Sequence, residues 1–179
     1  MSDKPKAKEA KAKPAKAAAP TVEAKPAPQA APKVANDGVM YIDATGHVAG
    51  RLCSVVAHEI IRGKHVVVLN AEKAIITGNR SSVVEQWKQR LELGSKVNPI
   101  NGPLHPRRPD NILWRMVRGM VPKTKTKGEL GLKRLRVYMG VPEKYSGVTT
   151  SKVDQAMATR PLPLYLTIAE LSKNIGWNG

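Results

Sequence analysis

The feature that most constrains the fold is an apolar strand, a helical pattern and a second apolar strand in close succession. Val39 to Ala44 (VMYIDA) is short, apolar and partly β-branched, as expected for a buried strand. His65 to Asn70 (HVVVLN) is a continuous apolar run, typical of a strand covered on both faces. A strand–helix–strand unit of this length requires parallel pairing and a right-handed crossover. The helix between them has one apolar face, made of Val48, Leu52, Val55, Val56 and Ile60, and Gly63 ends it.

Shorter elements are predicted along the rest of the folded region. Ala74 to Thr77 favours a third strand, and a second helix follows with Trp87 buried on its apolar side. Ser82 and Glu85 have the spacing of a capping box at the start of that helix. Together the patterns predict an α/β sandwich with a small parallel sheet. The remaining expected elements are a third helix beginning at Pro109, a strand at Leu135 to Met139, and a C-terminal helix capped by Thr167 and Glu170.

The first 38 residues differ in composition from everything that follows. Ala, Pro and Lys supply 26 of them, and no aromatic residue occurs. Such a segment cannot bury enough apolar surface to offset its ordering entropy, so a disordered tail over 1–38 and a folded domain over 39–179 are expected. The tail is expected either to solubilise the protein or to act as an RNA-contacting arm. It lacks the apolar region of a secretory signal, and no run in the chain is long enough to span a bilayer.

Positive charge is concentrated in one stretch of the chain. Between His105 and Arg136 there are ten Lys or Arg residues and two acids, and the whole chain carries a formal charge of +16. Charge of this density indicates a polyanionic partner, most simply a phosphate backbone. Aromatic residues make up only 4% and Phe is absent, which argues against base stacking on an aromatic sheet surface.

The basic residues form two candidate phosphate-binding surfaces. Arginine suits phosphate because its planar fork bonds two oxygens at once. Rigid basic loops can join RNA helices by backbone and shape rather than by sequence. His105, Arg51 and Arg80 are further candidates. The first surface comprises Arg107, Arg108, Arg115 and Arg118, and the second comprises Lys123, Lys125, Lys127, Lys133, Arg134 and Arg136.

Patterns for catalysis and cofactors are weak by comparison. Gly46 to Arg51 occupies the position of a dinucleotide fingerprint, but its spacing is GxxxG, and Asn70 stands where a ribose-binding acid belongs. Tight helix packing through Gly50 is the alternative, with Arg51 facing solvent or RNA. The Thr77 to Arg80 turn could hold a phosphate at a helix start, or it could simply be a capped turn.

Neither the cysteine nor the histidines indicate a reactive centre. Cys53, the only cysteine, lies on the apolar side of a predicted helix, which favours a small buried hydrophobe and a reducing compartment. The four histidines lack metal-ligand spacing and have no associated carboxylate cluster. The sequence therefore predicts no enzyme activity, no metal and no cofactor.

Three long motifs, in order, resemble the universal large-subunit ribosomal protein thirteen family. They are IDATGHVAGRLCS, VVVLNAEKAIITGNR and GPLHPRRPDNILWRMVRGMVPKTKTKGELGLKRLRVYMGVP, and the resemblance runs from Val39 to about Gly147. HPRRPD, VRGM and LKRLRVYMGVP are similar to the archaeal and eukaryotic branch. The chain lacks the long C-terminal helical extension of eukaryotic members, which favours the archaeal side.

The resemblance implies a three-layer α/β/α sandwich with a four-stranded, mostly parallel sheet. It also implies a structural, non-enzymatic role in the cytoplasmic large ribosomal subunit, supporting its assembly. The implied partners are large-subunit ribosomal RNA and neighbouring ribosomal proteins, with no membrane and no small-molecule substrate. A free RNA-binding regulator or RNA chaperone using the same basic surfaces is the main alternative. A nucleotide-dependent enzyme built on the strand–helix–strand unit is a second, and the missing acid argues against it.

Overall fold

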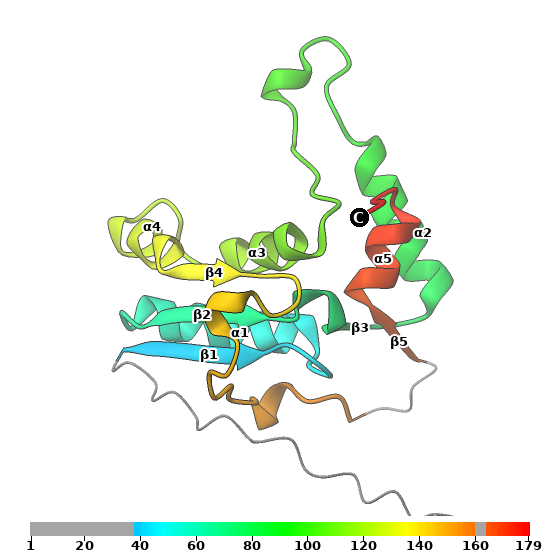
Figure 1. The fold of residues 1–179 in the computed structure, drawn as a ribbon. Coiled ribbons are helices and arrows are strands. Elements are labelled where there is room, and N and C mark those ends of the chain that lie inside the picture. Colours follow the sequence, from blue (N-terminus) through cyan, green and yellow to red (C-terminus); the bar gives the residue numbers. More distant parts are fainter. Residues whose placement is uncertain (1–37, 160–163) are drawn as a thin grey trace, which may run out of the picture. The chain divides into compact units, whose positions relative to one another are not determined.

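A computed structural model of the chain describes residues 38–159 and 164–179. The predicted N-terminal tail, apart from Gly38, lies outside these ranges. The described residues form a mixed α/β domain (Figure 1). Its helices and strands are β1 (Val39–Asp43), α1 (Ala49–Ile61), β2 (His65–Leu69), β3 (Ile75–Thr77), α2 (Arg80–Glu92), α3 (Pro109–Met120), α4 (Thr126–Lys133), β4 (Leu135–Val137), β5 (Tyr165–Thr167) and α5 (Ile168–Asn174), with short 3₁₀ turns η1 (Ala71–Lys73), η2 (Pro99–Asn101), η3 (Glu143–Tyr145) and η4 (Asp154–Ala156).

The main sheet has the order β1-β2-β4, and both strand pairs are parallel. Val39 pairs with His65, and Val66 pairs with Leu135. Helix α1 is the crossover between β1 and β2, so the strand–helix–strand unit predicted from the sequence is confirmed. Gly63 follows α1 with a φ of 106°, a left-handed conformation that glycine adopts without steric cost. The mostly parallel α/β class is therefore confirmed.

The fourth strand differs from expectation. Strand β3 pairs antiparallel with β5, from Ile75–Thr167 to Thr77–Tyr165, in a separate two-stranded sheet. Only η1 and its flanking residues separate β2 from β3, whereas a parallel return beside β2 would need a crossover of a dozen or more residues. Asn70, with φ 54°, turns the chain out of the first sheet. The described residues thus form three parallel strands and an antiparallel pair.

One face of the main sheet is packed against α1 and α3. Ile42, Val66 and Val68 of the sheet are fully buried there. Cys53 of α1 is also fully buried, and its Sγ lies 3.8 Å from the carbonyl oxygen of Leu113 in α3. Burial raises the pKa of the Cys53 thiol to about 12, so it stays protonated and acts as a small packing group, as predicted.

The opposite face is covered in part by the 3₁₀ turn η3, in the segment that follows β4. Figure 1 shows η3 (orange) on the other side of the strands from α1. The ring of Tyr145 lies 5.6 Å from that of Tyr41 and 5.5 Å from that of Tyr138. Its hydrogen bond with Tyr138 raises the pKa of Tyr145. The outer helical layer implied by the family resemblance is therefore, on this face, a layer of turns and aromatic rings.

Helix α2 departs from two predictions. It begins at Arg80 after the N-cap residue Asn79, so Ser82 lies inside the helix and the predicted capping box is wrong. None of its residues is fully buried, and Trp87 is only half-buried, with the guanidinium of Arg90 5.4 Å from the ring centroid. At α5 the predicted N-cap Thr167 is confirmed, because the Glu170 amide donates a hydrogen bond of 3.2 Å to the Thr167 hydroxyl.

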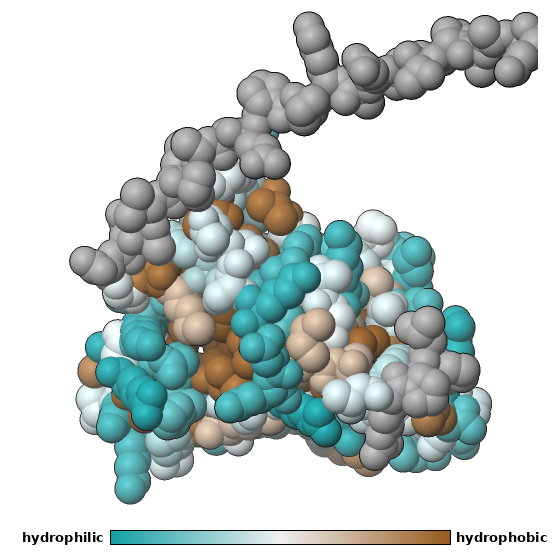
Figure 2. Space-filling view, turned by 90° about the horizontal axis from the view of Figure 1, so that it is seen from below, coloured by the Kyte–Doolittle hydropathy of each residue, from teal (hydrophilic) through white to brown (hydrophobic). Residues whose placement is uncertain are grey.

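Hydrophilic side chains cover much of the face seen from below, with smaller hydrophobic patches between them (Figure 2). Among the residues that the structure describes, no helix combines the length and apolar character needed to cross a bilayer.

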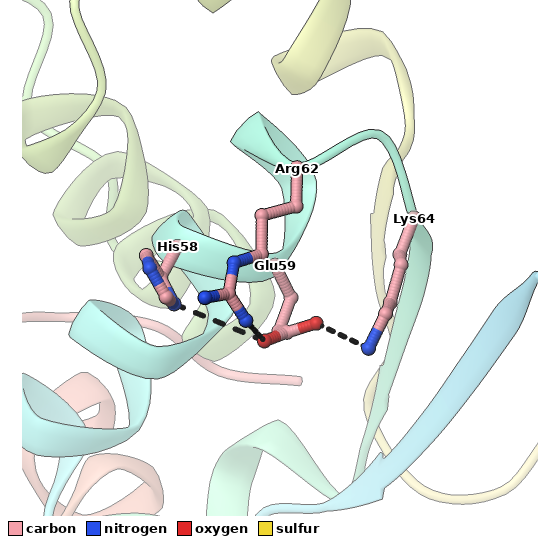
Figure 3. Close-up of polar contacts among 4 residues, drawn as sticks. All are labelled: His58, Glu59, Arg62 and Lys64. Atoms are coloured by element: carbon pink, nitrogen blue, oxygen red, sulfur yellow. Dashed lines mark hydrogen bonds and ion pairs between the residues drawn. The ribbon is translucent and has the colours of Figure 1, made fainter.

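A cluster of charges around Glu59 links the end of α1 to Lys64, the residue before β2 (Figure 3). The Glu59 side chain is 12% exposed, and one carboxylate oxygen lies 2.6 Å from Nζ of Lys64. The other oxygen lies 3.5 Å from the Arg62 guanidinium and 3.8 Å from Nδ1 of His58. The hydrogen bond from Lys64 is the largest cause that lowers the pKa of Glu59 below its ordinary value. Together with the charges of Lys64, Arg62 and His58, it outweighs burial, which acts to raise the pKa.

This lowered pKa predicts a pH-dependent contribution to stability. A carboxylate with a lowered folded-state pKa stabilises the fold above its unfolded pKa, near 4.5, and that contribution is lost as pH falls through the folded value. Glu59→Gln is therefore expected to lower the free energy of unfolding at pH 7, and its deficit relative to the wild type should shrink progressively as pH falls below about 4.5. Urea unfolding across this range measures the difference. Glu129→Gln is the control, because Glu129 is 68% exposed and its Lys133 contact is 3.8 Å. A wild-type advantage that stays constant with pH would contradict the prediction.

Candidate nucleic-acid interface

Helix α3 fixes the first group of predicted arginines. It begins at Pro109, as predicted, because proline at the first helical position loses no intrahelical hydrogen bond. Ile112, Leu113 and Val117 are buried against the core, so the helix has a strongly amphipathic arrangement. Arg115 and Arg118 are consequently held on the remaining, partly exposed face of a well-packed helix.

A hollow of about 390 Å³ opens at the start of α3. Arg108 at its rim forms an ion pair of 3.2 Å with Asp110. His105 Nε2 lies 2.9 Å from the carbonyl oxygen of Leu93, which joins the two ends of the segment between α2 and α3. This segment extends away from the sheet in Figure 1. The hollow is lined by Leu104, His105, Pro106, Arg107, Arg108, Asn111, Trp114 and Arg115.

A second hollow of about 230 Å³ adjoins the first, because Arg115 lines both. Its other lining residues are Arg118, Gly119, Val121 and Lys123. The sequence groups Lys123 with the later lysines, but the structure places it with the arginines of α3. The two hollows thus form one cationic surface, here called the arginine surface, made of His105, Arg107, Arg108, Arg115, Arg118 and Lys123.

The remaining residues of the second predicted group lie on the turn before α4, on α4 and on β4. Lys125, Lys127 and Lys133 are exposed, and Lys133 is 3.8 Å from Glu129. Arg136 is exposed on β4 and donates to the carbonyl oxygen of Leu135 at 3.3 Å, while Arg134 is half-buried. The structure does not gather these five residues around one hollow.

Arg51 and Arg80 line neither hollow of the arginine surface. Arg51 is exposed on α1, near Thr77 and Tyr165. Arg80 lies 3.7 Å from the carboxylate of Glu170, which already provides an anionic partner. Gly50 is exposed, and no atom lies within 4 Å of where its Cβ would stand, so the suggested tight packing at Gly50 is wrong.

Two residues of the first hollow were missed by sequence reasoning. Asn111 and Trp114 contribute an amide and an indole ring to a wall otherwise made of cations and apolar groups. The guanidinium of Arg118 lies 5.9 Å from the centroid of the Trp114 ring. Helical spacing was the available signal, since Asn111, Trp114, Arg115 and Arg118 follow the i, i+3, i+4, i+7 pattern of one helix face.

The fold and this surface define a class: a basic α/β protein with a rigid, hollowed cationic face. Within residues 38–159 and 164–179, no group of three His, Cys, Asp or Glu side chains could hold a metal ion. The two hollows are lined by cationic side chains, apolar groups, the Asn111 amide and the Trp114 indole.

Comparison with known proteins gives the family. Residues 37–144 match the family model described as ribosomal protein L13. The chain is 41% identical to "Large ribosomal subunit protein uL13" of Archaeoglobus fulgidus over 149 residues, 82% of this chain and 94% of the relative. It is 42% identical to the protein of that name from Methanopyrus kandleri, covering 76% and 86% of the two chains, and 38% identical to that from Caenorhabditis elegans, covering 76% and 68%. The chain belongs to the ribosomal protein L13 family, in its archaeal and eukaryotic branch.

Proposed function

We propose that this protein is a structural constituent of the large ribosomal subunit, in the cytoplasm, and that it binds large-subunit ribosomal RNA and supports subunit assembly. The observation that carries the RNA-binding role is the arginine surface, where two adjoining hollows share Arg115. Within the part of the chain that the structure describes, the one acid paired with a member of this surface is Asp110. Five arginine and lysine side chains therefore face a partner with little internal neutralisation, as phosphate binding requires.

The mechanism is positional rather than catalytic. Arg115 and Arg118 project from a helix whose opposite face is buried, so binding RNA costs little further ordering of the backbone. Their planar guanidinium groups can each bond two phosphate oxygens. The exposed residues Lys125, Lys127, Lys133 and Arg136 would extend these contacts to a neighbouring segment of RNA. Contacts of this kind read the shape of the backbone and fix the protein's orientation.

The two parts of the chain have different proposed roles. Residues 39–179 form the RNA-binding domain, and the Ala-, Lys- and Pro-rich residues 1–38 form an accessory tail. Arg51, Arg80 and Arg134 are secondary RNA contacts, with Arg80 weakened by its pairing with Glu170. Neighbouring ribosomal proteins complete the set of partners, and the protein needs neither a cofactor nor a small-molecule substrate.

Co-sedimentation tests the ribosomal role directly. The full-length protein, tagged and expressed in its source organism, is expected to co-sediment with large subunits in a sucrose gradient. It should stay bound to the subunits after a salt wash of about 0.5 M. An internal constituent is enclosed by folded RNA, so screening of its charges alone should not release it. A protein recovered mainly in the free fraction, or released completely by the wash, would instead identify a free RNA-binding regulator or chaperone.

A further inference from the structure

The first hollow of the arginine surface combines cationic groups with two side chains that phosphate binding alone does not require. Its charged groups, Arg107, Arg108 and Arg115, suit a phosphate. Its wall also includes the half-buried indole of Trp114 and the amide of Asn111. A plain electrostatic contact to an RNA helix needs neither group, because such contacts are made to phosphates and sugars.

Trp114 is half-buried and lines the first hollow, so part of its side chain is accessible there. The Arg118 guanidinium lies 5.9 Å from the ring centroid and lines the second hollow, whereas Trp114 lines the first. Trp114 also packs against the buried core, which restricts the motion of its side chain. An indole that packs against the core and also lines a cationic hollow is suited to stacking on a nucleobase.

We propose that the hollow beside Trp114 binds one unpaired nucleotide of RNA. Its base stacks on the Trp114 indole, its flanking phosphate is bonded by Arg107, Arg108 or Arg115, and the Asn111 amide is placed to contact the edge of the base. This inference rests on the proposed RNA-binding function and adds the class of ligand. A nucleotide inside a duplex cannot occupy the hollow in this way, because both faces of its base are already stacked on neighbouring bases.

The variant Trp114→Leu separates stacking from charge. It removes the ring and keeps an apolar side chain against the core. With full-length protein and a single-stranded hexa-adenylate RNA as probe, affinity is expected to fall about fivefold to a hundredfold. The dependence of affinity on salt concentration should not change, because stacking releases no counterions. Affinity for a 16-base-pair RNA duplex should change little.

A matched control exists on α2. Trp87 is also half-buried and also has an arginine near its ring, with Arg90 at 5.4 Å, but it lines neither hollow of the arginine surface. Trp87→Leu is therefore expected to leave binding of the hexa-adenylate unchanged. Trp114→Phe should retain most of the affinity, since a smaller aromatic face still stacks. Circular dichroism and thermal unfolding check that each variant is folded.

A spectroscopic measurement reports on the ring itself. A variant with Trp87 and Trp177 replaced by leucine retains Trp114 as its one tryptophan. Its fluorescence is expected to be quenched by the hexa-adenylate and not by the duplex. Equal affinities of Trp114→Leu and wild type, equal losses in Trp114→Phe and Trp114→Leu, or absence of quenching on binding would each overturn the inference. If these occur while arginine substitutions still weaken binding, the RNA-binding function stands and only the nucleotide site is rejected.

Discussion

Replacing Arg107, Arg108, Arg115 and Arg118 together by alanine is expected to flatten the salt dependence of RNA binding by about three units of log–log slope. Each phosphate contact contributes roughly 0.7–0.9 units through counterion release, and four contacts would be lost. The measurement is the dissociation constant for large-subunit RNA at several salt concentrations. Binding should weaken most at low salt, where the four contacts contribute most.

The domain should remain folded in this variant. None of the four arginines is fully buried, and the core contacts of α3 come from Ile112, Leu113 and Val117. Arg115 and Arg118 are half-buried, so their aliphatic stems contribute some packing, and thermal unfolding should detect only a modest loss.

A charge-matched substitution supplies the control. Replacing Lys4, Lys6, Lys8 and Lys11 by alanine removes the same formal charge from a segment whose composition favours disorder. Its effect on affinity is expected to be smaller, because a flexible segment loses entropy when it binds. If both quadruple variants weaken binding equally, net charge rather than the arginine surface governs the interaction.

Gly128→Ala is expected to destabilise the domain by about 3 kcal/mol or more, equivalent to a fall in Tm of roughly 6–12 °C. Gly128 lies in α4, and an added Cβ would stand 2.7 Å from the carbonyl carbon of Pro122 and closer still to its oxygen. This is a contact with backbone, so relief requires the turn or the helix to move. The turn carries Lys123 and Lys125, so RNA binding should weaken as well. Differential scanning calorimetry measures the first effect.

Gly119→Ala gives the matched comparison. Gly119 is also helical, near the end of α3, but no atom lies within 4 Å of where its Cβ would stand. Alanine is favoured over glycine in helices by up to about 1 kcal/mol, so this variant should be as stable as the wild type or slightly more stable. Similar destabilisation by both changes would show that the contact at Pro122 is not the cause.

The parts of the fold that depend on local patterns were predictable from the sequence. The apolar runs at β1 and β2 and the stripe of α1 identified the parallel unit, and Pro109 marked the start of α3. The sequence predicted the N-cap correctly at Thr167 and wrongly at Ser82. A capping box indicates a possible start, and at α2 the N-cap is Asn79, three residues before Ser82.

The grouping of residues that are distant in sequence needed the tertiary structure. Strand β3 is short, and its pairing with β5 joins segments about 90 residues apart, which no local pattern specifies. Burial depends on what covers a face, so Trp87 on α2, with little packed against it, is only half-buried. Lys123 lies with Arg115 and Arg118 because the chain turns at the end of α3.

By itself, therefore, the sequence determined the α/β class, the family and the concentration of positive charge after His105. These follow from composition, from hydrophobic periodicity and from motifs that are contiguous in the chain. The tertiary structure decided that six of the basic residues form one hollowed surface and that Trp114 belongs to it. The physical reason is that packing the apolar face of α3 against the core fixes where its other side chains point, and the same helix brings the loop before it and the turn after it to one side of the domain.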